Sequence, residues 1–444
     1  MKVLHATSEM FPLIKTGGLA DVSLSLPNAL SEQGSDVRIL LPAYRDVLAY
    51  GHEFHILGIS EIQLGGNLHH VKILEIHPEQ AAVPVWLVDC PELFDRPGNP
   101  YVDGNGYDWP DNAERFTCFS MVAAHISTGQ IDLGWKPDVV HSHDWQTGLV
   151  AAFLHGLANA PRTIFTIHNL SYTGQFSYEE YARMQLPMEW WHPEGLEFYG
   201  GFSMLKAGLV YSDAINTVSP TYAREILTPE FGYGMEGVLN HYHYKLSGIL
   251  NGLDTKTWDP SGDPNLEKNY SIKNRKSGKR TNKQALLQSM DIYDGEQWLN
   301  RPLFGSVGRL VEQKGIDILA SVIPLLLQEH DVGFIIIGEG QQHYVDQLAS
   351  LQHHYPNQVR LFIGYSEREA HLVEAGADFF IMPSRFEPCG LNQLYSLRYG
   401  TLPIVHNVGG LADTVIDASK ENIKNKTATG LVFNEANSED LLGA

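Results

Sequence analysis

Long apolar runs are absent from this sequence. A helix that crosses a membrane needs roughly 20 consecutive apolar residues, and the 444 residues contain no such run. The apolar stretch at the N-terminus is interrupted at Glu9, which makes it too short for a secretory signal and typical of a first β-strand. We therefore expect a cytoplasmic protein with no membrane partner.

Basic residues are scarce relative to acidic ones. The chain has 31 Lys and Arg against 52 Asp and Glu, which gives a formal net charge of −21. Nucleic acids are bound through basic surfaces, so this composition argues against a nucleic-acid partner. A nucleotide ligand is compatible with the charge, because a few local cations and backbone N–H groups are enough to bind its phosphates.

Cysteine is scarce as well. The three cysteines, Cys90, Cys118 and Cys389, form no Cys-x-x-Cys pair, and three thiols cannot all pair within one chain. Thiols stay reduced in the cytoplasm, where disulfides are rare. We therefore expect three reduced thiols and no disulfide framework.

Short β-rich runs alternate with longer helical patterns in the first half of the chain. This alternation is typical of parallel sheets flanked by helices, and most of the runs are continuously apolar, as in sheets covered on both faces. Strands are predicted at Lys2–Thr7, Asp36–Leu41, Val71–Ile76, Val83–Val88, Asp138–His141, Thr163–Ile167 and Ala214–Val218. Helices are predicted near Gly18–Gln33, Asn112–Thr128, Gln146–Leu157 and Pro220–Leu227.

The same pattern restarts in the second half. Strands are predicted at Leu303–Val307, Gly333–Ile337, Val359–Ile363, Phe379–Met382, Leu402–Val405 and Gly430–Phe433, and helices near Gly315–Gln328, Gln341–Leu351, Glu367–Ala375, Gly390–Tyr399, Gly410–Ala418 and Ser438–Leu442. A polar stretch between the halves indicates a domain boundary near Gly252. Within it, the composition of Ser271–Lys283 predicts a surface segment and is typical of mobile segments. We therefore predict an α/β fold of two doubly wound parallel-sheet domains, 1–251 and 252–444, with a cleft between them.

Ligands of such sheets bind beyond the carboxyl ends of the strands, so the loops that follow the strands are the candidates for a site. The loop Lys15–Asp21 follows the first strand. Its Gly17-Gly18 pair allows a ligand to approach the backbone, and the N-terminus of the following helix favours an anion. Lys15 adds a cation, and Asp21 is suited to orient a hydroxyl or cap the helix. An ordinary strand-to-helix turn is the alternative.

Two more polar loops follow strands of the first half. One contains His141, His143, Asp144 and Trp145, and the other contains His168 and Asn169. Histidines two residues apart on a strand can bind a metal, but the sequence shows no third ligand beside them. Polar groups with one aromatic residue at strand ends favour a wall that binds sugar, and we expect no metal here.

Cations and a carboxylate follow strands of the second half. Arg309 leaves one strand and Lys314 precedes the next helix, a combination suited to bind a diphosphate; a helix cap with solvated cations is the alternative. Tyr365 is placed to stack on a base or to pack within its own loop. In the loop Pro383–Leu391, Glu387 can accept hydrogen bonds from sugar hydroxyls, and Gly390-Leu391 opens a helix.

An Asp-x-Asp motif is absent from the whole chain. Many sugar-nucleotide transferases hold a metal ion with that motif, so we expect no metal and no other cofactor. The charge of a leaving phosphate would then be neutralised by helix N-termini and by cations. The available cations are Lys15, Arg309 and Lys314.

The loops, in this order and on these elements, resemble those of the bacterial glycogen synthases and plant starch synthases. The most specific motifs are Lys15-Thr16-Gly17-Gly18-Leu19-Ala20-Asp21 and Arg385-Phe386-Glu387-Pro388-Cys389-Gly390-Leu391, and the similarity extends to Gly409–Val415. The resemblance implies two facing Rossmann-like domains of the GT-B type. It also implies retaining transfer of glucose from ADP-glucose to the non-reducing end of an α-1,4-glucan such as glycogen.

The resemblance also implies roles for particular residues. Arg309 and Lys314 correspond to the pair that binds the diphosphate, and Lys15 and Gly18 to donor contacts near the phosphates. The residues that correspond to the loop around the glucose are Glu387, Cys389, Gly390 and Leu391. Tyr365 corresponds to the adenine-stacking residue. His168 corresponds to the histidine at the reacting face of the sugar, with Asn169 and Asn251 nearby. Asp144 and Trp145 correspond to residues on the acceptor side. Asp21 is a further expected substrate contact.

Three features depart from the family pattern. Gln146 stands where a histidine is expected, and Asn392 where a threonine is expected; both are polar, so we expect tuned activity. Relatives are expected to continue past a position like Ala444 with a helical segment that crosses back onto the first domain, and we expect the second domain here to lack that segment.

Two other functions are compatible with the sequence. One is a glucan synthase that prefers UDP-glucose, and the other is an α-glucan-binding or regulatory protein with weak catalysis. The cations Lys15, Arg309 and Lys314 favour an enzyme, because a protein that only binds glucan has no need to bind a diphosphate.

Overall fold

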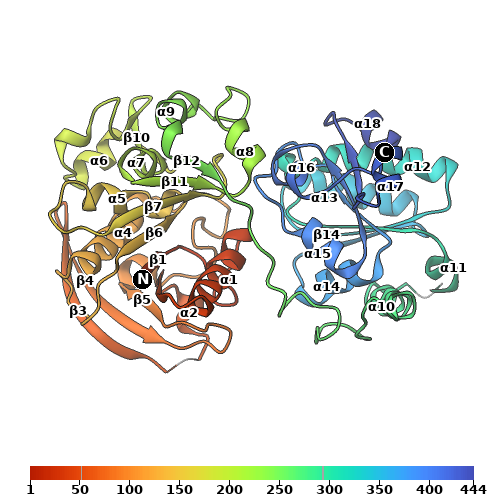
Figure 1. The fold of residues 1–444 in the computed structure, drawn as a ribbon, viewed down its shortest axis with the longest axis horizontal. Helices are drawn as coiled ribbons and strands as arrows, with labels where there is room; N and C mark the ends of the chain where they lie inside the picture. The colour runs from red at the N-terminus through yellow and green to blue at the C-terminus, as the bar shows by residue number, and fades with distance from the viewer. Residues whose placement is uncertain (52, 293–294) are drawn as a thin grey trace. The chain divides into compact units, whose positions relative to one another are not determined.

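The computed structural model describes residues 1–51, 53–292 and 295–444. The chain divides into two compact units. The first comprises Met1–Val218 and Ala223–Gly252, and the second comprises Leu253–Ala444 together with the short segment Ser219–Tyr222. Figure 1 shows each unit as a sheet covered by helices.

The first unit is built on a nine-stranded sheet with the order β12-β11-β7-β6-β1-β2-β5-β4-β3. From β12 to β5 neighbouring strands pair in parallel, while β3 and β4 form an antiparallel edge. The strands are β1 (Lys2–Ala6), β2 (Asp36–Pro42), β3 (His55–Leu64), β4 (Asn67–Ile76), β5 (Val85–Asp89), β6 (Val139–His143), β7 (Arg162–Ile167), β11 (Ala214–Thr217) and β12 (Leu246–Gly248). This order puts the carboxyl ends of β1, β6 and β7 side by side.

Helices follow the parallel strands of the first unit; four of those described lie within predicted segments, and the others were not predicted. The helices are α1 (Gly18–Glu32), α2 (Arg45–Leu48), α3 (Pro91–Phe94), α4 (Asn112–Thr128), α5 (Leu149–Leu154), α6 (Tyr178–Arg183), α7 (Met204–Tyr211) and α9 (Glu236–His241), with α8 (Pro220–Glu225) at the junction of the units. The first unit also contains a small antiparallel sheet. Its strands, in sheet order, are β8 (Gln175–Phe176), β10 (Gly201–Ser203) and β9 (Glu197–Phe198).

The edge hairpin β3–β4 is the main strand feature that the sequence did not predict in full. Only Val71–Ile76 of β4 was predicted, and β3 was missed. Ile56 and Ile59 of β3 are exposed, so the strand has no continuous apolar run of the kind that marks the buried strands of the same sheet. Because these apolar side chains face solvent, the apolar residues of β3 do not mark one buried face of the strand.

The second unit is built on a six-stranded, all-parallel sheet with the order β15-β14-β13-β16-β17-β18. The strands are β13 (Leu303–Val307), β14 (Gly333–Gly338), β15 (Val359–Ile363), β16 (Phe379–Met382), β17 (Leu402–His406) and β18 (Leu431–Phe433). The helices are α10 (Arg275–Ser289), α11 (Gly295–Asn300), α12 (Ile316–Glu329), α13 (Gln342–His354), α14 (Glu367–Gly376), α15 (Asn392–Tyr399), α16 (Gly409–Thr414), α17 (Lys420–Asn425) and α18 (Ser438–Gly443).

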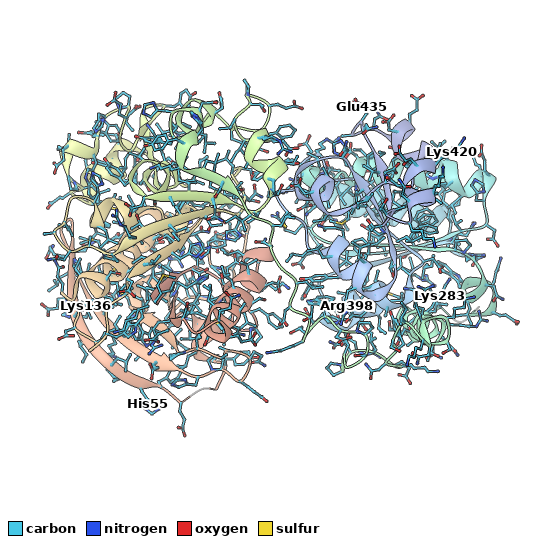
Figure 2. All side chains as sticks on the ribbon, in the orientation of Figure 1. His55, Lys136, Lys283, Arg398, Lys420 and Glu435 are labelled. Carbon is cyan, nitrogen blue, oxygen red and sulfur yellow. The ribbon has the colours of Figure 1, made fainter. Side chains whose placement is uncertain are left out.

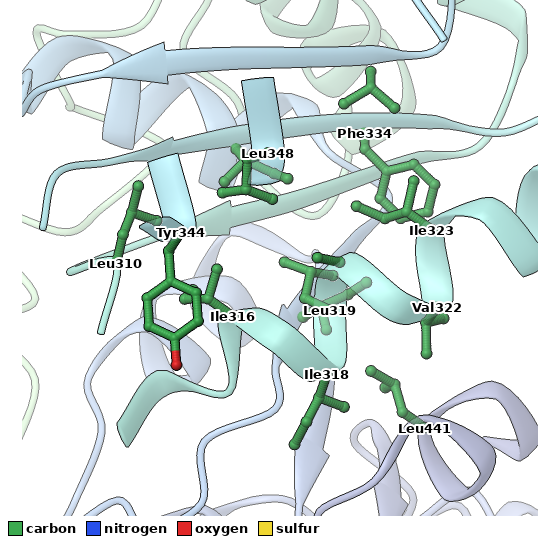
Figure 3. Packing of buried hydrophobic residues seen from close by; sticks show 14 of the residues in the cluster. Leu310, Ile316, Ile318, Leu319, Val322, Ile323, Phe334, Tyr344, Leu348 and Leu441 are labelled. Atoms are coloured by element: carbon green, nitrogen blue, oxygen red, sulfur yellow. The ribbon is translucent and has the colours of Figure 1, made fainter. Parts of the chain in front are cut away.

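The core of the second unit lies between the sheet and helices α12 and α13. Figure 3 shows Leu319 and Ile323 of α12 packed near Phe334 of β14, with Leu441 of α18 approaching Val322. All five side chains are at least 95% buried. Burial of this kind contributes about 1.5–3 kcal/mol per large apolar side chain, which fixes the loops at both ends of α12.

Much of the segment Ser271–Lys283 lies at the surface, as predicted, with Ser271–Ser277 exposed. From Arg275 onward it belongs to helix α10, which was not predicted. Its Lys, Arg, Gln and Ala residues favour a helix despite their polarity. Lys283 lies on α10 in Figure 2; it is buried, and its Nζ donates to Arg301 O at 2.6 Å and to Asp378 Oδ2 at 2.9 Å. A polar helix can therefore pack against the unit through paired charges.

Within the described residues, no helix has both the length and the apolar character needed to cross a membrane.

Candidate functional site

A buried carboxylate holds the loop that follows β1. Glu9 Oε2 accepts hydrogen bonds from the backbone N–H of Thr16 at 2.6 Å and of Gly17 at 3.2 Å. Its Oε1 accepts from the Thr16 hydroxyl at 2.5 Å and from the Tyr101 hydroxyl at 2.7 Å. Burial raises the pKa of Glu9, although these bonds oppose the shift. Glu9 and Tyr101 were not predicted as site residues, and they set the backbone of the loop.

The loop Lys15–Asp21 carries an ion pair at the start of α1. Lys15 Nζ lies 2.9 Å from Asp21 Oδ1, and both side chains are partly buried. Helix α1 begins at Gly18 after Gly17, and no side chain caps it. Its first N–H groups therefore keep the partial positive charge of an uncapped helix N-terminus. The loop thus joins a lysine, a carboxylate and a helix N-terminus within one turn.

Asp144 links the carboxyl ends of β6 and β7. Its Oδ1 accepts hydrogen bonds from the backbone N–H of His168 at 2.7 Å and of Asn169 at 3.4 Å. The backbone of Asp144 has φ 55° and ψ −175°, a conformation that costs about 1–3 kcal/mol in a residue other than glycine. Burial raises the pKa of its carboxyl to about 7. A strained, half-buried carboxylate at strand ends is typical of functional sites.

A row of histidine rings runs from His168 into the sheet. His143 Nδ1 lies 2.9 Å from His168 Nε2, and His143 Nε2 lies 3.2 Å from His5 Nδ1. Each contact needs one proton, which neutral rings can supply. Burial lowers the pKa of His168 to about 3 and that of His143 well below its usual value. The rings are therefore neutral near pH 7, and His168 acts through hydrogen bonds.

The sequence showed no third metal ligand beside His141 and His143, but the pairing of β1 with β6 supplies one. His5 faces His141 across these strands, and the three rings each offer a nitrogen within 4.8 Å of the others. Their other contacts are hydrogen bonds within the protein: His141 Nε2 lies 2.6 Å from Thr166 Oγ1, and both nitrogens of His143 face other rings. These bonds use both ring nitrogens of His143 and one of His141, whereas His5 Nε2 is buried and has no hydrogen-bond partner among the described residues.

Two asparagines of the candidate site lie on the first unit. The Asn169 side chain accepts hydrogen bonds from Ser171 N at 3.1 Å and Ser171 Oγ at 2.7 Å, which fixes its orientation. Asn251 is half-buried and lies three residues after β12, near the end of the unit. The structure thus brings Asp144, His168 and Asn169 together, and Asn251 lies on a separate segment.

In the second unit, the predicted lysine and glutamate are in direct contact. Lys314 Nζ lies 2.5 Å from Glu387 Oε2, and Ser384 Oγ donates to the same oxygen at 3.0 Å. Glu387 is 6% exposed. Both contacts use Oε2, and among the described residues no hydrogen bond to Oε1 is found. The carboxylate therefore keeps one oxygen for a ligand.

The loops that carry Lys314 and Glu387 are held together by their neighbours. Arg385 forms two hydrogen bonds with the carboxylate of Asp317 in α12, at 2.8 and 2.7 Å, and its N–H donates to Gln313 O at 2.8 Å. Gly315 has φ 65°, and a Cβ there would lie 2.0 Å from Pro383 O. Only glycine allows this close approach, so the lysine loop and the glutamate loop are fixed against each other.

A pocket lies beyond the carboxyl ends of β13, β14 and β16. The side chains that line it include Arg309, Lys314, Ser384 and Asn392. The exposed Arg309 lies with its Nη2 3.4 Å from Gln313 Oε1. Two cations thus border one pocket in the strand-end position expected for a phosphate-binding site.

The remaining predicted residues of this unit lie on two loops. Tyr365 is 56% exposed, and its hydroxyl donates to Glu367 at the start of α14. Cys389 is buried, Gly390 has φ 72°, and Leu391 precedes α15. These three residues follow Glu387 after Pro388, so one turn carries all four.

Comparisons with known proteins agree with this arrangement. The family described as the starch synthase catalytic domain matches residues 2–241, and the family described as glycosyl transferases group 1 matches residues 294–444. The chain is 51% identical to the glycogen synthase of Hydrogenovibrio crunogenus over 437 residues, which cover 98% of this chain and 89% of that protein. It is 48% identical to glycogen synthase 2 of Nitrosococcus oceani over 443 residues, which cover 100% of this chain and 89% of that protein.

The chain belongs to the glycogen and starch synthase family.

The solved catalytic domain of starch synthase IV from Arabidopsis thaliana, bound to ADP and acarbose, has the same fold. It superimposes with a TM-score of 0.90 at 33% identity, covering 100% of this chain and 90% of that one. The fold is therefore GT-B-like, with two parallel-sheet domains, as predicted. The β3–β4 edge is a local antiparallel addition to the first of them.

Two of the departures from the family pattern, Asn392 and Gln146, have defined places in the structure. Asn392 Nδ2 donates to Val307 O at 2.8 Å at the end of β13, so this side chain holds the strand end beside Lys314. Gln146 is buried, and within the described part of the chain its Oε1 has no hydrogen-bond partner. A buried amide oxygen without a partner is costly, and nothing in the structure explains it.

Proposed function

We propose that the loops described above carry out the reaction of the glycogen and starch synthase family. The chain is a glucosyltransferase that transfers glucose from ADP-glucose to an α-1,4-glucan. The observation that carries the proposal is the pocket beyond β13, β14 and β16, where Arg309 and Lys314 border one space and Glu387 is fixed beside it.

Arg309 and Lys314 are proposed to bind the diphosphate of the donor. Both lie on the loop between β13 and α12, and their charges suit a leaving group that bears negative charge. The family resemblance adds Lys15 and Gly18 as contacts near the phosphates, which the uncapped N-terminus of α1 supports. Tyr365 is proposed to stack on the adenine through its exposed ring. The solved relative holds ADP, which supports an adenine nucleotide as the donor.

Glu387 is proposed to bind hydroxyls of the transferred glucose. Its Oε1 accepts no hydrogen bond within the described residues, and Lys314 neutralises its charge from the other side. Cys389, Gly390 and Leu391 would line the same sugar with backbone groups of the fixed turn. In the absence of donor, the Lys314–Glu387 contact stabilises both charges; a phosphate would then compete for Lys314.

His168 is proposed to lie at the reacting face of the sugar, with Asn169 and Asn251 nearby. Burial keeps its ring neutral, which suits a hydrogen bond to a hydroxyl better than to a phosphate. Asp144 orients His168 and Asn169 through their N–H groups, and Asp144, Trp145 and Asp21 are proposed for the acceptor side. No carboxylate is assigned as a nucleophile.

Retention without a nucleophile is explained by a front-face mechanism. The leaving phosphate accepts the proton of the incoming glucan hydroxyl while the bond to the sugar breaks. The protein contributes positioning and charge neutralisation through Lys15, Arg309 and Lys314. No metal is needed in this scheme.

A reducing compartment suits the cysteines of the chain. Among the described residues Cys90, Cys118 and Cys389 are buried and form no disulfide. We propose a cytoplasmic location on this ground, with no nucleic-acid partner, because the net charge is −21.

The experiment is the incorporation of labelled glucose into glycogen from ADP-glucose and, in parallel, from UDP-glucose. Faster transfer from ADP-glucose, with retained configuration, supports the proposal. Faster transfer from UDP-glucose would show that the protein is a glucan synthase that prefers UDP-glucose as its donor. Glucan binding without transfer from either donor would make the protein a binding or regulatory protein and would remove the proposed catalytic roles.

A further inference from the structure

A second group of metal-type ligands lies in the first unit on different segments from the candidate site. His69 is on β4, Cys90 follows β5, and Glu92 is on α3. Each offers a ligand atom, and these atoms all lie within 4.8 Å of one another. Strands β4 and β5 pair in the sheet, and Lys72 faces Asp89 in their register, so the cluster lies at the end of this pairing. In the strand order, β4 lies between β5 and the edge strand β3 (Figure 1).

The ring of His69 is placed between two carboxylates. Its Nε2 lies 3.1 Å from Glu114 Oε1, and its Nδ1 lies 3.2 Å from Glu92 Oε1. A neutral imidazole carries one N–H, so it can donate to only one of the two. The other contact is completed either by a second proton on the ring or by a cation held between that nitrogen and the carboxylate.

Glu114 fixes which nitrogen donates. Its Oε1 also accepts from Asn67 Nδ2 at 2.6 Å, so the carboxylate is oriented toward His69 by the rest of the strand. Histidine ligands of metal ions usually donate their second N–H to a carboxylate in this way. With Nε2–H on Glu114, the lone pair of Nδ1 points to the side where Glu92 and Cys90 lie.

Cys90 supplies a sulfur to the same space. It is fully buried, and contact with Cys118 together with burial raises the pKa of its thiol. The thiol also hydrogen-bonds with Glu92, which helps to lower the pKa of that carboxyl. A divalent ion bound to the sulfur would displace the proton of the thiol, because a thiol bound to metal is deprotonated.

The ligand set and its exposure suit a zinc-type ion. Nitrogen, sulfur and carboxylate oxygen together are typical ligands of Zn²⁺, whereas Mg²⁺ and Ca²⁺ prefer oxygen alone. Ligand atoms around a tetrahedral Zn²⁺ lie about 3–4 Å apart, and the 3.2 Å between His69 Nδ1 and Glu92 Oε1 fits this spacing. The Glu92 side chain is 50% exposed, so an ion can enter from solvent.

We propose that His69 Nδ1, Cys90 Sγ and a carboxylate oxygen of Glu92 bind one zinc-type divalent cation, with water in the fourth position and Glu114 orienting His69. The ion is structural. It joins β4 to the start of the segment between β5 and α4, the segment that carries Tyr101 to Glu9.

Cobalt substitution tests the sulfur ligand directly. The full chain, reduced and stripped with a chelator, is titrated with Co²⁺ and followed by absorption. One equivalent should produce a near-ultraviolet thiolate-to-cobalt band and the intense visible bands of a tetrahedral site. Cys90→Ser should lose the thiolate band, and Cys118→Ser, which removes the neighbouring thiol, should keep it. Absence of the band in the unmodified chain, or its survival in Cys90→Ser, would overturn the proposal.

Zinc affinity tests the other two residues. Competition with a chromogenic chelator should show at least about a tenfold loss of affinity in His69→Ala and Glu92→Gln, and about a tenfold to hundredfold loss in Glu114→Gln. His70→Ala is the matched control, because His70 is the next residue on β4 and its side chain is 71% exposed. Zn²⁺ should raise the melting temperature of the unmodified chain and of His70→Ala, and leave His69→Ala unchanged. Equal affinity in His69→Ala and His70→Ala would contradict the assignment.

Discussion

The loop after β1 and the pair of loops after β13 and β16 are each organised around a buried carboxylate, but the two carboxylates are used differently. Glu9 accepts four hydrogen bonds from neutral donors, on both of its oxygens. Glu387 receives a lysine and a hydroxyl on one oxygen only. The first carboxylate is fully used in shaping its own loop, whereas the second keeps capacity for a substrate. Both carboxylates are buried, so the unused acceptor oxygen is what singles out Glu387 as the candidate to bind substrate.

The largest effect on activity is expected from the loss of Lys314, on the loop after β13. Lys314→Ala should reduce glucosyl transfer by about a hundredfold to a thousandfold, because one preorganised charge contact to the phosphates is lost. Steady-state rates with ADP-glucose measure this. Lys420→Ala, at an exposed lysine of the same unit labelled in Figure 2, is the control and should retain full activity. Similar rates in both variants would remove Lys314 from the site.

The pH dependence of stability tests the carboxylate at β6. The pKa of Asp144 is raised from 3.8 to about 7 by burial, so the stability it contributes is present below the unfolded pKa and is lost as pH rises through the folded pKa. Asp144→Asn lacks this loss. The stability of Asp144→Asn relative to the unmodified chain should therefore increase by about 2–3 kcal/mol between about pH 5 and about pH 8, or less where water screens the half-buried group. Urea unfolding at both pH values measures it, and parallel pH profiles would contradict it.

Glu9 should matter more for stability than for chemistry. Glu9→Gln replaces one acceptor oxygen with an amide NH₂, which leaves donors of the loop unsatisfied. The free energy of unfolding should fall by about 1–3 kcal/mol. Tyr101→Phe removes the bond to the same carboxylate and the contact with Ser8 Oγ at 2.8 Å, and should cost about 1–2 kcal/mol. A loss of activity in Glu9→Gln as large as that of Lys314→Ala, with unchanged stability, would show that Glu9 contacts substrate.

The smallest effect is expected at the ion pair that supports Glu387 from outside. Arg385→Lys loses the bidentate contact with Asp317. The side chains of Arg385 and Asp317 are 33% and 42% exposed, respectively. Exposed pairs contribute about 0.2–1 kcal/mol, so the unfolding free energy should change by no more than about 1 kcal/mol. Thermal unfolding measures this, and a larger loss would mean that the pair also holds the loop against Gly315.

Much of the fold could be predicted because its strands are short apolar runs bounded by turns. The bounds of β13, β15 and β16 equal those predicted, and α4 does so as well. Strand β3 was missed because its exposed isoleucines leave no core-facing signal. Helix α10 was not predicted because its sequence is mostly polar. The sequence does not show that Lys283 pairs with Asp378 and is buried in this way.

The candidate site was only partly accessible to sequence reasoning. Residues after strands could be found, because parallel strands bring their carboxyl ends together. Glu9 and Tyr101 could not, since their contact joins positions 92 residues apart. The direct contact of Lys314 with Glu387 was not predicted either, because it depends on the close approach of two loops at Gly315.

The most direct test of the account is the rate of labelled glucose transfer from ADP-glucose to glycogen by the unmodified chain and by Glu387→Gln. The account predicts transfer by the unmodified chain and a loss of about a hundredfold or more in Glu387→Gln, with an unchanged circular dichroism spectrum. A folded Glu387→Gln variant with near-normal transfer would contradict it.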